Sequence, residues 1–118
     1  MTAPDASLAG EDYCYLTTTG RKSGEPREIE IWFGLEGRVL YMLAGSGPKA
    51  DWVRNLQKQP SVQLRIDETT YRGRARVVAG GEEEALARRL LVDKYTARHH
   101  SELESWGREA LPVAIDFE

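Results

Sequence analysis

The sequence predicts an α+β domain in which short antiparallel strands close into a small barrel. Strand-like segments recur between glycine-rich turns, only two stretches have helical character, and no repeat or linker divides the 118 residues. Short, bent strands avoid open sheet edges by closing into a barrel, and a chain of this length can bury a core without disulfides. We therefore expect a single domain over residues 13–118, preceded by a flexible lead-in over residues 1–12.

The first half of the chain predicts three strands, over residues 13–18, 26–35 and 38–44. In the second of them, Ile29, Ile31 and Phe33 alternate with polar residues and Trp32, as in a half-buried strand. The turn at Glu36-Gly37 then leads into an apolar run that we interpret as the partner strand of a hairpin.

The second half predicts one short helix, a second hairpin, one long helix and a closing strand. The short helix spans residues 50–59 and ends at Pro60, and the hairpin strands span residues 61–67 and 69–78. The long helix spans residues 82–109, with an acidic first turn and an apolar stripe, and the closing strand spans residues 111–117. Three arginines share one face of the second hairpin, where pairing with Glu and Asp is the favoured interpretation: Arg72, Arg74 and Arg76.

Composition excludes several classes of protein. With 16 Lys+Arg against 19 Asp+Glu the net charge is −3, which disfavours a broad grip on nucleic acid. The longest apolar run, residues 39–44, is far shorter than the roughly 20 residues of a membrane helix, and the first 12 residues lack an export signal. The single cysteine, Cys14, can form no internal bridge, so we expect a cytoplasmic protein.

Metal binding and nucleophilic hydrolysis find no support in the sequence. His99 and His100 are adjacent, so they point in different directions on a helix, and no cysteine or carboxylate lies at ligand spacing. Ser46 is not flanked as in a nucleophile elbow. We therefore expect no metal site and no catalytic triad.

Two cationic, glycine-rich loops are the candidate binding site. Residues 20–24 contain Arg21, Lys22 and Ser23, with Arg27 shortly after, and residues 45–50 open the short helix. The second loop fits a dinucleotide fingerprint, but the surrounding hairpins leave no room for a parallel sheet. By itself it is better interpreted as an ordinary solvated loop, whereas the two loops together indicate an anion with more than one charge. On the short helix, Trp52 and Asn55 share a face that suits a flat ring, although Trp52 is equally suited to a core.

Three strings of this sequence resemble the deazaflavin-dependent nitroreductase family: LTTTGRKSGEPRE (residues 16–28), AGSGPKADWVRNLQKQPSVQ (residues 44–63) and ESWGREALPVAID (residues 104–116). The resemblance covers most of the chain from Tyr13 onward. It implies the split β-barrel of the pyridoxamine phosphate oxidase-like flavoproteins. We therefore expect an α+β split β-barrel, antiparallel with about six strands, one short helix and one long helix.

The resemblance also implies a cofactor, coenzyme F-420, an 8-hydroxy-5-deazaflavin whose tail carries a phosphate and glutamates. By similarity, the cofactor-binding residues are Arg21, Lys22, Ser23 and Arg27 for the tail, Ser46, Gly47 and Lys49 beside the phosphate, and Trp52 and Asn55 along the groove. The implied activity is hydride transfer from the reduced coenzyme to a small electron-poor molecule, namely a quinone, an enone or a nitro compound. Candidates for the substrate side are Trp32, Tyr13 and His100.

Two other functions remain open at this point. One is an FMN-binding split-barrel oxidoreductase, which we rank lower because FMN has a single phosphate. The other is a non-catalytic split barrel that binds a cofactor, lipid or haem. In relatives that reduce bulky nitro-heterocycles, tyrosines face the substrate where this chain has Ala97, His100 and Leu103, so a nitro-prodrug activity is not assumed. Analogy with other split barrels favours a homodimer.

Overall fold

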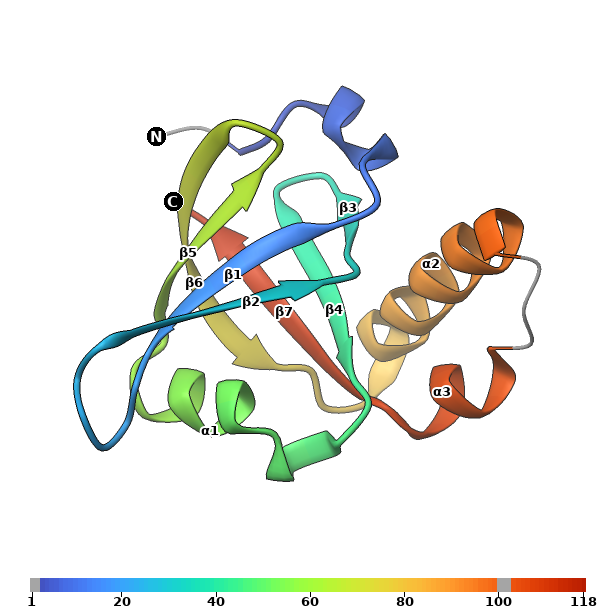
Figure 1. The fold of residues 1–118 in the computed structure, drawn as a ribbon. Coiled ribbons are helices and arrows are strands. Elements are labelled where there is room, and N and C mark those ends of the chain that lie inside the picture. The colour runs from blue at the N-terminus through green and yellow to red at the C-terminus, as the bar shows by residue number, and fades with distance from the viewer. Residues whose placement is uncertain (1–2, 100–102) are drawn as a thin grey trace.

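Seven antiparallel strands form one curled sheet in the computed structural model of the chain, which describes residues 3–99 and 103–118 (Figure 1). The strand order is β2-β1-β5-β6-β7-β4-β3. The strands are β1 (Cys14–Thr19), β2 (Pro26–Ile31), β3 (Gly34–Glu36), β4 (Val39–Ala44), β5 (Ser61–Ile66), β6 (Thr69–Val77) and β7 (Leu111–Phe117). The helices are α1 (Asp51–Lys58), α2 (Gly81–His99) and α3 (Glu104–Glu109), with short 3-10 turns η1 (Ala6–Gly10) and η2 (Gly47–Lys49). The predicted α+β split β-barrel is confirmed, with seven strands where about six were expected and with α3 as a further short helix.

The single strand predicted over residues 26–35 is wrong, because the chain bends at Trp32 and Phe33. Before the bend, β2 pairs with β1, and after it β3 pairs with β4. These two short strands are the opposite edges of the sheet, so the bend carries the chain from one edge to the other and closes most of the barrel. Phe33 is fully buried at the bend.

The continuous helix predicted over residues 82–109 is also wrong, because α2 ends at His99 and α3 begins at Glu104. A Cβ atom added to Gly107 would lie 2.4 Å from Val92 Cγ2. In one straight helix these two residues would be about 22 Å apart along the axis. The chain therefore folds back after α2, and α3 packs against it. The break between α2 and α3 therefore depends on packing between residues that are distant in sequence. The periodicity of a local segment carries no information about such packing.

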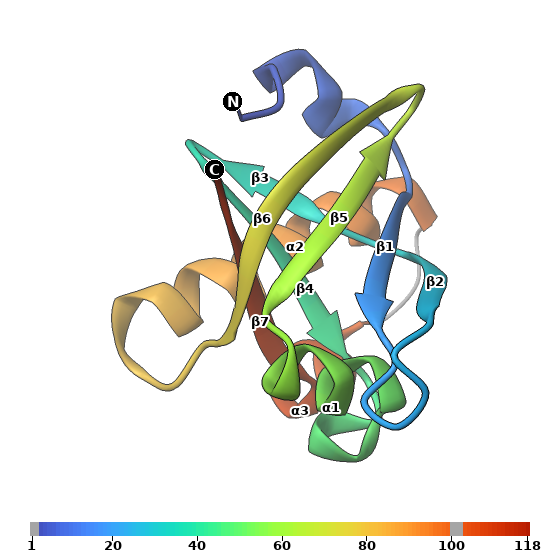
Figure 2. The same ribbon diagram turned by 90° about the vertical axis from the view of Figure 1, so that its left-hand side faces the viewer.

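The core has two parts. The interior of the barrel is filled by side chains from most of the strands, with Leu16, Leu40, Leu64 and Ile115 fully buried. A second cluster, which includes Leu91 and Tyr95, lies between α2 and the outer face of the sheet. In Figure 2, β5 and β6 face the viewer and α2 lies behind them, so α2 covers only one side of the barrel. Both views place α1 and α3 at the same end of the barrel.

Residues 10–12 contact the C-terminal half of α2. Backbone carbonyls at positions 10–12 accept hydrogen bonds from Arg98, Lys94 and Tyr95 in α2. The flexibility expected of the lead-in stays a prediction. None of the helices within the described residues is long and apolar enough to cross a membrane.

Candidate functional site

A pocket of about 360 Å³ lies between the β1–β2 loop and α1. Its lining comes from two parts of the chain about 30 residues apart: Gly20, Arg21, Lys22, Ser23, Arg27 and Ile29 from the loop and β2, and Asp51, Trp52 and Asn55 from α1. Six of the nine cofactor-binding residues predicted from the sequence thus surround one space. Gly20, Ile29 and Asp51 were not predicted, although Asp51 lies in the quoted string of residues 44–63.

The β1–β2 loop has a shape that requires its glycines. Gly24 has a φ of 75°, in the left-handed region, and its N–H donates to the Gly20 carbonyl at 2.8 Å. A Cβ atom on Gly20 would lie 2.8 Å from Ser23 Oγ. The loop is thus a tight turn that brings the side chains of residues 21–23 to the pocket.

Arg21 fastens this loop to α1. Its Nη1 donates to Asn55 Oδ1 at 2.9 Å, its backbone N–H donates to the same oxygen at 3.1 Å, and its Nη2 lies 3.1 Å from Asp51 Oδ1. Asn55 Nδ2 in turn donates to Thr18 Oγ1 at 3.2 Å. Asn55 is only 4% exposed, so its amide is a buried connection between loop, helix and β1.

Lys22 and Arg27 are the less committed cations of the pocket. Within the described residues, Lys22 has no hydrogen-bond or ion-pair partner and is exposed. Arg27 makes a 3.3 Å hydrogen bond to Ser23 Oγ and a long contact of 3.8 Å to Glu25. The pocket wall therefore carries three cations against one carboxylate, Asp51, beside the apolar surfaces of Ile29 and Trp52. A ligand with an anionic part and an apolar part fits such a wall.

The second glycine-rich loop lies next to this pocket without lining it. Gly47 and Lys49 form η2, which leads directly into α1, and Gly47 has a φ of 64°. Ser46 and Lys49 are exposed. The structure thus places Ser46, Gly47 and Lys49 before the N-terminus of α1, beside the pocket residue Asp51.

Trp32 lies in an aromatic group with α2 and α3. Its ring stacks on Tyr95 with centroids 4.1 Å apart and on His99 at 5.0 Å, and it meets Trp106 edge-on at 5.5 Å. The rings of Tyr95 and His99 are nearly parallel, and their centroids are 6.1 Å apart, too close for the two rings to lie on opposite faces of the indole, so both cover the same face. We call Trp32, Tyr95, His99 and Trp106 the aromatic group.

Of the other two substrate-side candidates, the structure describes one, Tyr13. Tyr13 is 42% exposed just before β1, and His100 lies outside the described residues. The sequence indicated Tyr95 only as part of the apolar stripe of the long helix, and it gave Trp106 no role. The signal for Trp106 was its place in the quoted string of residues 104–116.

Hydrogen bonds from α2 fix the backbone that carries Trp32. Tyr95 Oη accepts from the Phe33 N–H at 2.9 Å and donates to the Asp12 carbonyl at 2.7 Å. Lys94 Nζ donates to the Phe33 carbonyl at 2.9 Å and lies 3.9 Å above the Phe33 ring. Burial beside this ring lowers the pKa of Lys94 to about 8.

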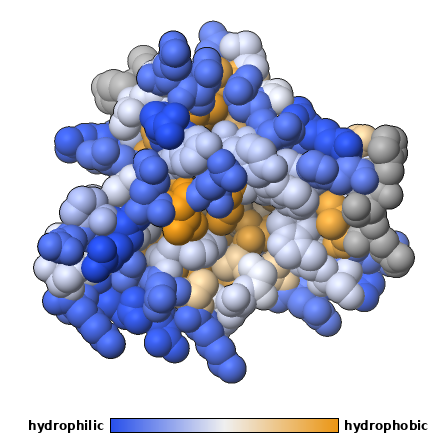
Figure 3. Space-filling model, viewed as in Figure 1, coloured by the Kyte–Doolittle hydropathy of each residue, from blue (hydrophilic) through white to orange (hydrophobic). Residues whose placement is uncertain are grey.

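β2 and the second glycine-rich loop connect the pocket to the aromatic group. Ile29 in the pocket wall is three residues before Trp32, and a Cβ atom on Gly45, next to the second loop, would lie 3.9 Å from Trp106 Cδ1. Seen from the side of Figure 1, apolar side chains reach the surface in the middle of this face, around β2 and in the area between α1 and α3 (Figure 3). Within residues 3–99 and 103–118, no group of three or more His, Cys, Asp or Glu side chains could hold a metal ion.

Comparison with known proteins finds one matching family model and several similar proteins. The family model described as F420H(2)-dependent quinone reductase matches residues 5–118. An F420H(2)-dependent quinone reductase of Mycobacterium tuberculosis is 22% identical over 103 residues, covering 85% of this chain and 69% of that protein. A solved structure of an F420-H2 dependent reductase, FDR-A, is 27% identical with a TM-score of 0.70, covering 91% of this chain and 94% of that one. A solved domain-swapped dimer is also 27% identical with a TM-score of 0.70, covering 91% of this chain and 80% of that one.

Proposed function

The chain belongs to the F420H(2)-dependent quinone reductase family, and from this premise we propose that it transfers a hydride from reduced coenzyme F-420 to a small electron-poor molecule, a quinone in the first place. The family match confirms the predictions of an oxidoreductase and of F-420 as its cofactor. An FMN cofactor and a non-catalytic storage role are therefore not retained.

The observation that carries the proposal is the pocket between the β1–β2 loop and α1. Its excess of positive charge suits the phosphate and glutamates of the coenzyme tail, and Ile29 and Trp52 offer apolar surface beside them. The guanidinium of Arg21 is already bound to Asp51 and Asn55. We therefore assign anion binding chiefly to Lys22 and Arg27, with Ser23 as a hydroxyl donor. We assign Ser46, Gly47 and Lys49, beside the N-terminus of α1, to the phosphate.

When bound, coenzyme F-420 supplies the hydride donor, and the chain supplies binding, orientation and exclusion of water. We propose that Trp32, at the far end of β2 from the pocket, bounds the space in which hydride donor and acceptor meet. One face of its indole is already covered by Tyr95 and His99. The indole is therefore held in a fixed orientation, as positioning of a planar partner requires.

The test is a fluorescence titration of the purified protein with oxidised F-420, with FMN in parallel, at low and at high salt. We expect binding of F-420 in preference to FMN, weakening as salt rises because the contacts are between charges. Turnover is then measured with reduced F-420 and a naphthoquinone, menadione. Absence of F-420 binding, or preference for FMN, would contradict the proposal.

Two further parts of the proposal concern the state of the protein. We propose that it is a homodimer, supported by the resemblance to a solved domain-swapped dimer, and analytical ultracentrifugation tests this directly. The cytoplasmic location inferred from the single cysteine, Cys14, also stays a prediction.

A further inference from the structure

Helix α3 is too short to hold its own place. It has six residues, and its N-terminal flanking residue, Leu103, makes no side-chain capping hydrogen bond. Isolated helices of this length are not stable in water. The position of α3, and of any side chain that it carries, is therefore decided by its contacts with the rest of the protein.

Two contacts dock α3 on α2. Arg88 of α2 donates from Nη1 to the carbonyls of Gly107 and Ala110, at 2.8 Å each, and its Nε is held by Glu84 at 3.1 Å. These carbonyls belong to the last turn of α3 and the residue after it, so Arg88 supplies donors that the helix end lacks. Next to them, Gly107 is buried so tightly against Val92 that no Cβ fits at position 107.

The docked helix carries one member of the aromatic group, Trp106. Its indole meets Trp32 at 90° with centroids 5.5 Å apart, and it lies close to Gly45 at the end of β4. Tyr95 and His99 cover one face of Trp32, and the angle that the Trp106 indole makes with Trp32 depends on where α3 sits. A corner of two perpendicular aromatic rings is suited to a flat ring, which stacks on one and meets the other edge-on.

We propose that Arg88 is a positioning residue for the quinone substrate: it holds α3 so that Trp106 and Trp32 form the corner that receives the quinone ring. This inference rests on the proposed function and deepens it. It predicts that Arg88 affects quinone binding and leaves coenzyme binding unchanged. The reason is that the coenzyme tail is assigned to the pocket between the β1–β2 loop and α1, and the hydrogen bonds of Arg88 go to neither of those elements.

The first experiment compares wild type, Arg88→Met and Arg88→Lys, with Arg89→Met as the matched control. Arg89 is the exposed neighbour on the same helix. Menadione binding is measured in the protein without coenzyme by quenching of tryptophan fluorescence, F-420 affinity by titration, and KM for menadione by turnover. For Arg88→Met we expect weaker menadione binding and a KM raised about fivefold, with F-420 affinity unchanged. Arg88→Lys recovers part of the loss, and Arg89→Met behaves as wild type.

A second pair of variants tests the docking without touching Arg88. Gly107→Ala forces a clash with Val92 and is expected to raise KM for menadione, although alanine is the better helix former. The double variant Gly107→Ala/Val92→Ala removes the clash and is expected to restore KM. These variants also serve if Arg88→Met fails to fold.

The role of Trp106 is isolated by a double-mutant cycle. In the Trp106→Ala background, Arg88→Met is expected to have no further effect on KM for menadione, while its effect on stability remains. The inference is overturned if Arg88→Met lowers stability but leaves menadione binding and KM unchanged, or if F-420 affinity falls by the same factor. Failure of the wild type to bind F-420 would instead overturn the proposed function. Because menadione binding is measured without coenzyme, that result is distinguishable from a failure of the inference about Arg88.

Discussion

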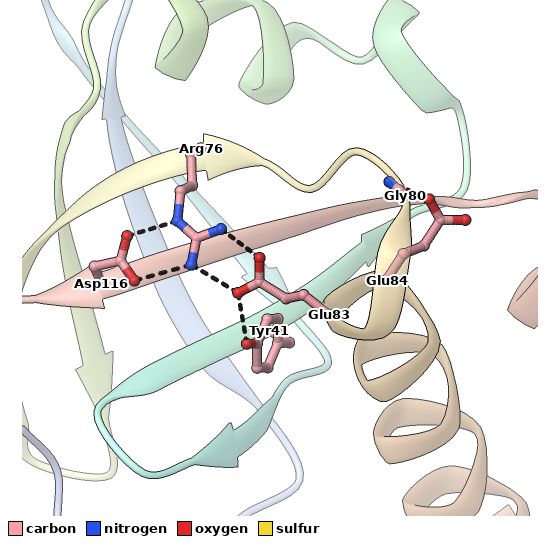
Figure 4. Close-up of polar contacts among 6 residues, drawn as sticks. All are labelled: Tyr41, Arg76, Gly80, Glu83, Glu84 and Asp116. Atoms are coloured by element: carbon pink, nitrogen blue, oxygen red, sulfur yellow. Dashed lines mark hydrogen bonds and ion pairs between the residues drawn. The ribbon is translucent and has the colours of Figure 1, made fainter.

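Two arginines each join a helix to the sheet, and their surroundings differ in charge. Arg21 joins the β1–β2 loop to α1 through one carboxylate, Asp51, and one amide, Asn55. Arg76 in β6 contacts two carboxylates, with its Nε 2.7 Å from Asp116 and its Nη1 2.6 Å from Glu83. Figure 4 shows Arg76 between β7 and the first turn of α2, where the hydroxyl of Tyr41 also donates to Glu83 at 2.8 Å.

This difference in surrounding charge indicates which cations are available to bind an anionic ligand. The charge of Arg76 is opposed by two carboxylates, Glu83 and Asp116. Hydrogen bonds from Arg76 and Tyr41 lower the pKa of Glu83 to about 2, so this carboxylate stays charged. Around Arg21 the balance is reversed, because Lys22 and Arg27 add two positive charges on the same pocket wall. We infer that the Arg76 network is structural, whereas the Arg21 network both holds the loop and leaves positive charge for an anion.

The largest effect is expected from Asn55→Ala, at the centre of the Arg21 network. The change removes the acceptor of two Arg21 groups and leaves the hydroxyl of buried Thr18 without its donor. We expect the free energy of unfolding to fall by about 3 kcal/mol and F-420 affinity to fall with it, because the loop loses its anchor. Urea unfolding and F-420 titration measure the two effects.

The control is Gln57→Ala, an exposed position on the same helix, for which a change of no more than about 0.5 kcal/mol is expected. If Asn55→Ala destabilised the protein and left F-420 affinity intact, the loop geometry would not be part of the binding site.

The next effect in size concerns the Arg76 network. Arg76→Met leaves Glu83 and Asp116 without their shared cation, and we expect a loss of about 2 kcal/mol, limited because these side chains are 35–47% exposed. F-420 affinity should not change, since none of these residues lines the pocket. Urea unfolding and F-420 titration are compared with those of Arg74→Met, an exposed arginine of the same strand. A parallel fall in F-420 affinity would abolish the distinction between the two networks.

The sequence predicted most elements of the fold but missed two breaks that depend on contacts between distant residues. Alternation and turn residues predicted β1, β4, β5, β6, α1 and β7 to within a residue or two at each end. The bend at Trp32 and the break between α2 and α3 escaped prediction, because the segments around both are locally regular. They are decided by Tyr95 Oη bonding the backbone of Phe33 and by Val92 packing against Gly107, contacts between residues distant in sequence.

The candidate site divides in the same way. Two cationic, glycine-rich loops together with the family resemblance predicted Arg21, Lys22, Ser23 and Arg27, and the pocket is lined by all four. The sequence could not show that Arg21 is committed to Asp51 while Lys22 is not, because that depends on how α1 docks. Nor could it bring Trp106 to Trp32, because the turn-back of α3 creates that contact.

A smaller effect on stability and a clear effect on binding are expected from Lys22→Ala/Arg27→Ala. These side chains have few internal partners, so the free energy of unfolding should change by less than about 0.5 kcal/mol. F-420 affinity should fall about tenfold, and its salt dependence should become weaker because two charged contacts are lost. Titrations at two salt concentrations measure both, with Arg54→Ala, an exposed cation of α1 outside the pocket lining, as the control. Equal losses in the Arg54 variant would show that general charge, not the pocket, attracts the coenzyme.

The smallest expected effect is a pH dependence of the stability that the Arg76 network contributes. Hydrogen bonds from Arg76 and Tyr41 lower the pKa of Glu83 from its usual 4.5 to about 2. The stabilisation is therefore fully present above pH 4.5 and is lost as pH falls towards 2, because the unfolded chain takes up the proton first. We expect wild type to exceed Glu83→Gln in free energy of unfolding by about 1 kcal/mol near neutral pH, since Glu83 is 35% exposed, and the difference to shrink across this window. Urea unfolding of both proteins at a series of pH values measures this difference in stability. A difference that stayed constant with pH would mean that Glu83 contributes through its shape and packing. Charge would then not distinguish the Arg76 network from the Arg21 network.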